Sequence, residues 1–123
     1  MAVRTLSTIL ICFAGLINFL PLIGALSRKR VEALYDVTIE DGTYEVLLRH
    51  RAVLFGIVGT LMITSAFVAS LRPAGYAAGF TAMLSYLLLA ARVGNHNANI
   101  RRVAIVDIIA TAALLTAALI DYA

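Results

Sequence analysis

Charged residues are scarce in this 123-residue sequence, at 14%, and cysteine occurs only once. The single Cys12 has no partner for an intrachain disulfide, and a cysteine-rich metal site is excluded. The His-x-x-x-His and Glu-x-x-His spacings that helical metal sites use are also missing. No glycine-rich turn suited to nucleotide phosphates is present. The sequence therefore predicts neither a metal nor any other bound cofactor.

Apolar residues are abundant instead, at 62% of the chain, and the mean hydropathy is +0.94. Four apolar runs, each long enough to cross a bilayer, cover about residues 5–26, 44–70, 73–91 and 103–120. Backbone groups in lipid must be satisfied internally, and the absence of period-2 alternation favours helices over a barrel. The fold class is therefore predicted to be all-α: a polytopic membrane protein with a four-helix transmembrane bundle, in one domain over residues 1–123.

The first apolar run has a second interpretation as a signal peptide, with Arg4 before it and a small-residue segment ending at Ser27 after it. Its length, and the presence of Asn18 and Pro21, favour a membrane span. Pro21 is expected to kink this helix, and Asn18 to hydrogen-bond to a neighbouring span.

The only long loop, residues 27–46, is predicted to contain a short amphipathic helix at the membrane interface. Val31, Leu34 and Tyr35 have the spacing of one apolar helix face, and Arg28 and Glu32 form an i,i+4 pair.

Positive charge is distributed unevenly across the predicted membrane. Eight Lys and Arg residues fall on one face and two on the other: Arg28, Lys29, Arg30, Arg49, Arg51, Arg92, Arg101 and Arg102 against Arg4 and Arg72. By the positive-inside rule, the richer face is cytoplasmic and both termini face outward. Because these residues flank the spans, the net charge of +3 indicates topology or lipid headgroups and not nucleic acid.

Asp107 is the acidic residue that needs explaining, because it lies five residues beyond Arg102, about 7 Å deeper in a helix. An ionised carboxylate at that depth requires a partner, and Arg49 or Arg51, then His50, are the candidates. One interpretation is a preorganised charged pocket. The other is a structural ion pair between two helices.

Other polar residues are expected near the same face. Asn97 and its neighbours in the last loop are either capping residues or donors to a ligand headgroup, with Arg101 supplying charge. Tyr35 is expected to point its hydroxyl inward. The buried hydroxyl of Tyr86 is expected to find a partner in Asn18. The candidate ligand-binding residues are therefore Tyr35, Arg49, Arg51, Asn97, Arg101, Asn18 and Tyr86.

A GxxxG pair, Gly75 and Gly79, allows close helix approach in the third span. Packing within the bundle is the first interpretation, and a homo-oligomer formed through these glycines is the second.

The segments LYDVTIEDGTYEVLLRHRAVLFGIVG and NHNANIRRVAIVDI resemble small four-helix bacterial membrane proteins of the DoxX-like type. The resemblance implies a four-helix bundle in the bacterial inner membrane and no established activity. Similar sequences are sometimes labelled phosphopantetheine adenylyltransferase. That enzyme is a soluble α/β protein with an H-x-G-H motif, and neither His50 nor His96 stands in such a pattern.

The leading functional hypothesis is a pocket at the cytoplasmic-leaflet end that binds a membrane lipid or a lipophilic small molecule with a polar or anionic head. If the protein is an enzyme, His50 and Asp107 are the candidates for acid–base catalysis. A structural or accessory subunit whose charged face docks a partner protein is the alternative, and a small proton-coupled exporter is the third hypothesis.

Overall fold

The chain folds as an all-α protein with four long apolar helices. The structure is a computed structural model that describes residues 2–123, and this part of the chain contains no strand. Four segments are long and apolar enough to cross a membrane, which confirms the predicted helical bundle and indicates a multi-pass membrane protein. These segments are Val3–Leu26, Gly42–Phe67, Ala69–Val93 and Ala98–Tyr122.

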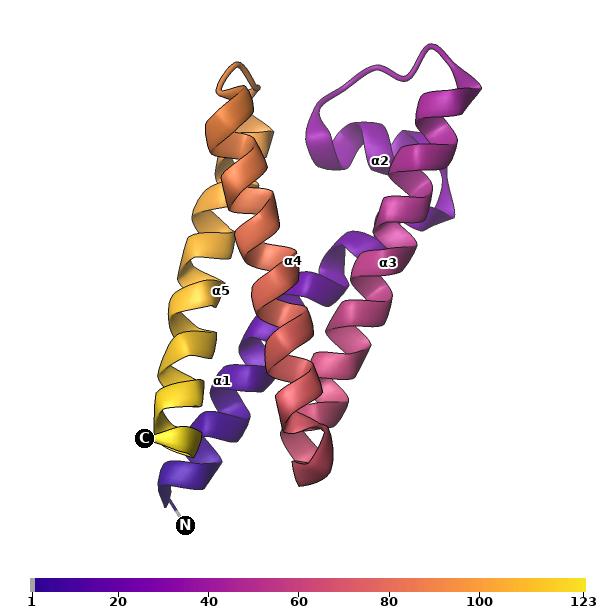
Figure 1. Cartoon of the computed structure of the whole chain (residues 1–123). Helices are drawn as coiled ribbons and strands as arrows, with labels where there is room; N and C mark the ends of the chain where they lie inside the picture. The colour runs from indigo at the N-terminus through magenta and orange to yellow at the C-terminus, as the bar shows by residue number, and fades with distance from the viewer. Residues whose placement is uncertain (1) are drawn as a thin grey trace.

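The long helices run alternately in opposite directions, and both ends of the chain lie at the same end of the bundle (Figure 1). In chain order the elements are α1 (Ala2–Phe19), the 3-10 segment η1 (Leu20–Leu26), α2 (Arg28–Tyr35), α3 (Gly42–Phe67), the 3-10 turn η2 (Ala69–Leu71), α4 (Arg72–Val93) and α5 (Ala98–Tyr122).

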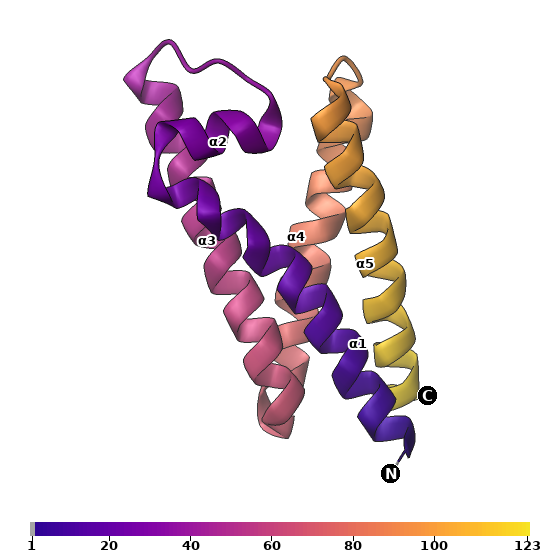
Figure 2. The ribbon, with the colours of Figure 1, turned by 180° about the vertical axis from the view of Figure 1, so that it is seen from behind.

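The four long helices form a ring in which α1 and α4 each pack against both α3 and α5. Within residues 2–123, α3 and α5 lie on opposite sides of this ring and do not pack against each other. In both views α3 diverges from the α4–α5 pair toward the end that carries α2 (Figures 1 and 2). The bundle therefore has a narrow end, near the termini, and a wide end, spanned by α2.

Large and small apolar side chains are distributed as expected for a protein surrounded by lipid. Many Leu, Ile, Val and Phe side chains are exposed on the outside, whereas much of the interior is built from small residues such as Ala14, Ala110 and Ala117. Small interior residues let helices approach closely when lipid provides no hydrophobic drive to assemble. At Gly59 the approach is extreme, because a Cβ there would lie 2.6 Å from a backbone nitrogen of α1.

The GxxxG pair serves packing inside the bundle. Gly75 and Gly79 are both buried, and added Cβ atoms would meet Ser65 of α3 and Leu114 of α5 respectively. The motif therefore packs helices together within the bundle, as its first interpretation states. Both glycines thus face neighbouring helices of the same chain, and the homo-oligomer stays a prediction.

Pro21 changes the type of helix, whereas the sequence predicts a kink in one continuous helix. The α-helical geometry ends at Phe19, and Pro21 lies in the first turn of the 3-10 segment η1. Proline has no N–H to donate to the residue four positions earlier, so it is tolerated best where a helix begins.

The narrow end is held by a buried polar network that no motif in the sequence predicts. The Arg72 side chain pairs with Asp121 at 2.8 Å, and these side chains are only 8% and 9% exposed. The same carboxylate accepts a hydrogen bond from the Tyr76 hydroxyl at 2.5 Å. Arg72 also donates to the hydroxyls of Ser7 and Thr8 at 2.8 and 2.6 Å and to a backbone carbonyl of α3. We call Arg72, Asp121, Tyr76, Ser7 and Thr8 the Arg72 cluster.

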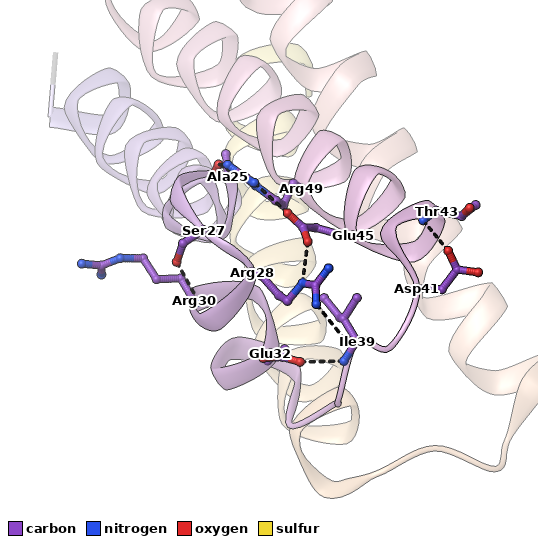
Figure 3. Close-up of polar contacts among 10 residues, drawn as sticks. All are labelled: Ala25, Ser27, Arg28, Arg30, Glu32, Ile39, Asp41, Thr43, Glu45 and Arg49. Carbon is purple, nitrogen blue, oxygen red and sulfur yellow. Dashed lines mark hydrogen bonds and ion pairs between the residues drawn. The ribbon is translucent and has the colours of Figure 1, made fainter.

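The first turn of α2 is fixed to α3 by an ionic network (Figure 3). Glu45 accepts from Arg28 at 2.5 Å and from Arg49 at 2.9 Å, and Arg49 also donates to the carbonyl of Ala25. The expected pair between Arg28 and Glu32 is wrong, because Glu32 instead accepts from the backbone N–H of Ile39. Glu45 thus fastens α2 to α3, while Glu32 holds the following loop against α2.

The other end of α2 is tied to α5. Asn97 caps α5 by accepting from the N–H of Ile100 at 2.9 Å, and its amide donates to the carbonyls of Tyr35 and Asp36 at 2.7 and 3.0 Å. This confirms the capping interpretation of Asn97 and starts α5 at Ala98, five residues before the predicted span. Since α2 is bound to α3 at one end and α5 at the other, it bridges the wide end of the bundle.

Candidate ligand-binding site

A cavity of about 430 Å³ lies at the wide end of the bundle, beneath α2 and between α1, η1, α3 and α5. Its volume falls within the range of small-molecule sites, roughly 300–1,000 Å³. Most of the wall is apolar, formed by Ile17, Leu20, Pro21, Ile23, Leu34, Phe55, Val103 and Val106. Six polar residues complete the lining, namely Asn18, Tyr35, Arg51, Asn99, Arg102 and Asp107.

Asp107 lies well inside the bundle, nine residues after the start of α5 and so about 14 Å along the helix. Its side chain is buried, with the residue 6% exposed. Within the described chain, the Asp107 carboxylate makes no salt bridge and accepts no hydrogen bond; only the backbone carbonyl is used, by the Thr111 hydroxyl at 2.6 Å. Arg51 is the cation whose charge acts on this carboxylate. The two groups are therefore charge partners across the cavity without being in contact.

Arg51 is held by three aromatic rings from three different helices. Its guanidinium carbon lies 5.0, 4.5 and 5.4 Å from the ring centroids of Tyr35, Phe55 and Tyr86. The guanidinium also donates a hydrogen bond to the Tyr35 hydroxyl. A cation over several ring faces is stabilised electrostatically, more so when it is shielded from water. The stack fixes the position of the positive charge relative to Asp107.

The three consecutive candidates of α3 point in different directions, because successive helix residues are rotated by about 100°. Arg51 reaches the cavity, whereas Arg49 is engaged with Glu45 and Ala25 outside it. His50 is exposed and does not line the cavity. The structure therefore does not bring His50 and Asp107 together.

Asn18 and Tyr86 do not form the expected pair. The Asn18 amide donates to the carbonyl of Ala14 at 3.0 Å, one turn earlier, and the residue is only 2% exposed. The Tyr86 hydroxyl donates instead to the carbonyl of Ile100 at 3.1 Å. Asn18 nevertheless lines the cavity, while Tyr86 lies on the far side of the Arg51 stack.

A second, shallower cavity of about 330 Å³ lies between α3 and α4, and Arg51 and Tyr35 contribute to both cavities. His96 lines this second cavity, and one of its ring nitrogens lies 3.1 Å from the carbonyl of Ala90, near the end of α4. Arg101 is exposed and lines neither cavity, whereas its neighbour Arg102 lines the first. The aromatic stack around Arg51 thus separates the two spaces.

Two further members of the site, Phe55 and Arg102, are indicated by helix spacing in the sequence. Phe55 follows Arg51 by four residues, which is the spacing of helix neighbours. Arg102 precedes Val106 by four residues, so the sequence places these two cavity residues on one face of α5. No group of three or more His, Cys, Asp or Glu side chains that could hold a metal ion occurs in residues 2–123.

Neither a protein-family model nor a curated protein or solved structure matches the chain. The resemblance to DoxX-like membrane proteins therefore stays a prediction from its motifs, and what the cavity binds has to follow from its own geometry.

Proposed function

We propose that this membrane protein binds a lipophilic small molecule with a polar or anionic head in the cavity beneath α2. The observation that carries the proposal is a buried Asp107 carboxylate, without a hydrogen-bond donor, on the wall of an otherwise largely apolar cavity. Ligand sites typically combine apolar walls with a few polar groups that orient the ligand.

Energetics support a ligand role for Asp107 over a purely structural one. A structural carboxylate inside a bundle is expected to be paired directly, as Asp121 is in the Arg72 cluster. Asp107 lacks such a contact, and its carboxylate is accessible from the cavity, where a hydrogen bond to a charged group contributes about 1.5–3 kcal/mol. A ligand that donates to this carboxylate would gain that free energy on binding.

The apolar walls of the cavity require that the ligand also has an apolar tail. Cavity residues from η1, such as Leu20 and Ile23, are also exposed on the outside of the bundle. A molecule already dissolved in the bilayer would therefore meet the cavity from the lipid, and its tail would lie against apolar side chains. If the Lys and Arg distribution sets the orientation, this end of the bundle faces the cytoplasmic leaflet.

Binding is better supported than catalysis. Acid–base chemistry by the two predicted residues would require both to reach the same substrate. His50 is exposed outside the cavity, so Asp107 alone is available for such a step. Transformation of the ligand therefore remains the less favoured form of the proposal.

Native mass spectrometry of protein released gently from its membrane would test the proposal. We expect the purified chain to retain a lipophile, and Asp107→Leu to reduce the retained fraction by about tenfold, because the polar head loses its acceptor. Thr116→Val is the matched control: Thr116 is also on α5 but is exposed, and its hydroxyl bonds only within the helix. That variant should retain the lipophile.

The same preparation distinguishes the accessory-subunit alternative. If Asp107→Leu lowers thermal stability in detergent but leaves the retained lipophile unchanged, Asp107 is structural and the binding proposal is wrong. If no lipophile is retained by any variant and a partner protein co-purifies, the docking alternative is favoured.

A further inference from the structure

Two polar groups on the α1 and α5 walls of the cavity are hydrogen-bond acceptors without a donor. Asp107 of α5 contributes a carboxylate, and Asn18 of α1 contributes an amide oxygen. The Asn18 amide nitrogen is identified by its partner, because the carbonyl of Ala14 can only accept a hydrogen bond. No donor in residues 2–123 hydrogen-bonds to either side-chain oxygen. The α1–α5 side of the cavity therefore offers acceptors that need a donor.

Hydrogen-bond donors come from the aromatic stack across the cavity, and α5 adds the exposed guanidinium of Arg102 and the Asn99 amide, which donates to the carbonyl of Leu34. Arg51 uses one N–H on the Tyr35 hydroxyl, and a guanidinium has five N–H donors in all. The Tyr35 hydroxyl accepts this bond, so its own proton is free to donate. A ligand that spans the cavity would place a donor toward Asp107 and an acceptor toward Arg51.

Charge limits the ligand further. Arg51 and Asp107 carry opposite charges, and both line the same cavity. Arg102, the third charged residue of the wall, is exposed and its charge can be solvated. A ligand bearing a net charge would leave an uncompensated charge in a region of low dielectric, which is costly. A neutral head avoids this cost.

We infer that the ligand is a neutral lipophile whose head carries a hydroxyl group, with the hydroxyl donating to the Asp107 carboxylate or the Asn18 amide oxygen and an oxygen of the head accepting from Arg51 or Tyr35. This inference rests on the proposed function and specifies the chemistry of its ligand. The proposed function allows a polar or an anionic head, and this inference narrows the choice to uncharged heads that can donate a hydrogen bond.

Four probes with the same alkyl tail test the inference: dodecanol, its methyl ether, dodecanoic acid and dodecylamine. Binding of each to the full chain in detergent is measured by titration in native mass spectrometry. The alcohol should bind most tightly. The ether, which lacks the donor, should bind at least about tenfold more weakly, equivalent to about 1.4 kcal/mol. The acid and the amine should also bind more weakly than the alcohol.

Variants of the acceptors identify the site. In Asp107→Leu the preference for alcohol over ether should fall to within about threefold, because the main acceptor is gone. Asn18→Leu provides a second, independent loss of an acceptor if the first variant folds poorly. The Thr116→Val control should keep the full preference.

The outcomes separate the two proposals. Tighter binding of the acid or the amine than of the alcohol would overturn the neutral-head inference and leave the binding function standing. Equal binding of alcohol and ether would overturn it as well. Failure of all four probes to bind would count against the proposed function itself.

Discussion

The Arg72 cluster should contribute strongly to stability, because it closes the narrow end of the bundle around a buried ion pair. Arg72 and Asp121 come from the starting end of α4 and the final turns of α5, and their side chains are 8% and 9% exposed. Removing one partner of a buried pair leaves the other charge uncompensated, which typically costs about 3–5 kcal/mol. Asp121→Leu also removes the partner of the Tyr76 hydroxyl.

We therefore expect Asp121→Leu to lower the free energy of unfolding by about 4 kcal/mol. The double variant Arg72→Met/Asp121→Leu removes the stranded charge and leaves mainly the Tyr76 hydroxyl unpaired, so its loss should be only about 1 kcal/mol. Ser7 and Thr8 do not lose their other partner, since both hydroxyls also donate to the carbonyl of Arg4.

Unfolding in mixed micelles with increasing SDS, followed by far-ultraviolet circular dichroism, gives these free energies for wild type, both single variants and the double variant. The reasoning would be refuted if Asp121→Leu lowered the free energy of unfolding by less than about 1 kcal/mol. It would also be refuted if the double variant were less stable than Asp121→Leu alone. Binding of the alkyl probes at the wide end should be unchanged wherever the variants remain folded.

Three further predictions concern packing and capping. Gly59→Ala should destabilise the protein by about 1–3 kcal/mol because its Cβ would meet the backbone of α1, whereas Gly42→Ala, with open space around it, should be tolerated in the same unfolding assay. Asn97→Ala should speed hydrogen exchange in α2 at least about fivefold, since the end of α2 loses two hydrogen bonds to the capping residue; unchanged exchange would contradict this. The hydrogen bond from the Thr43 N–H lowers the pKa of Asp41 from its ordinary 3.8, so the cap should stabilise α3 above that pH and weaken as the pH falls below it. Hydrogen exchange in the first turn of α3 should show this acid sensitivity in wild type and not in Asp41→Ala.

The helices could be predicted from the sequence because their signals are local. The apolar runs indicated four spans, and the spacing of Val31, Leu34 and Tyr35 indicated α2, in which Val31 and Tyr35 are buried. Helix ends were less accurate: α5 begins at Ala98, since Asn97 caps it, and the first span changes to 3-10 geometry around Pro21. Capping depends on side-chain hydrogen bonds that residue type alone does not determine.

The site was only partly predictable, because its contacts join residues far apart in the chain. The sequence singled out Asp107 and Arg51 but could not decide which of Arg49, His50 and Arg51 faces inward. That choice depends on the rotation of α3, which follows from its packing against α1. The pairing of Arg72 with Asp121 was missed for a similar reason, since an arginine next to a proline is typical of an exposed loop.

Occupancy of the cavity by a lipophile can be observed directly, because the chain contains no tryptophan. Phe55→Trp would place a fluorophore at the cavity wall, and Leu88→Trp would place one on an exposed position of α4. Bromododecanol should quench the fluorescence of the Phe55→Trp variant saturably, with displacement by unbrominated dodecanol and loss of saturation when Asp107→Leu is added. Quenching in the Leu88→Trp variant should rise only in proportion to the probe in the micelle. If the two variants responded alike and dodecanol displaced nothing, the cavity would not be a binding site.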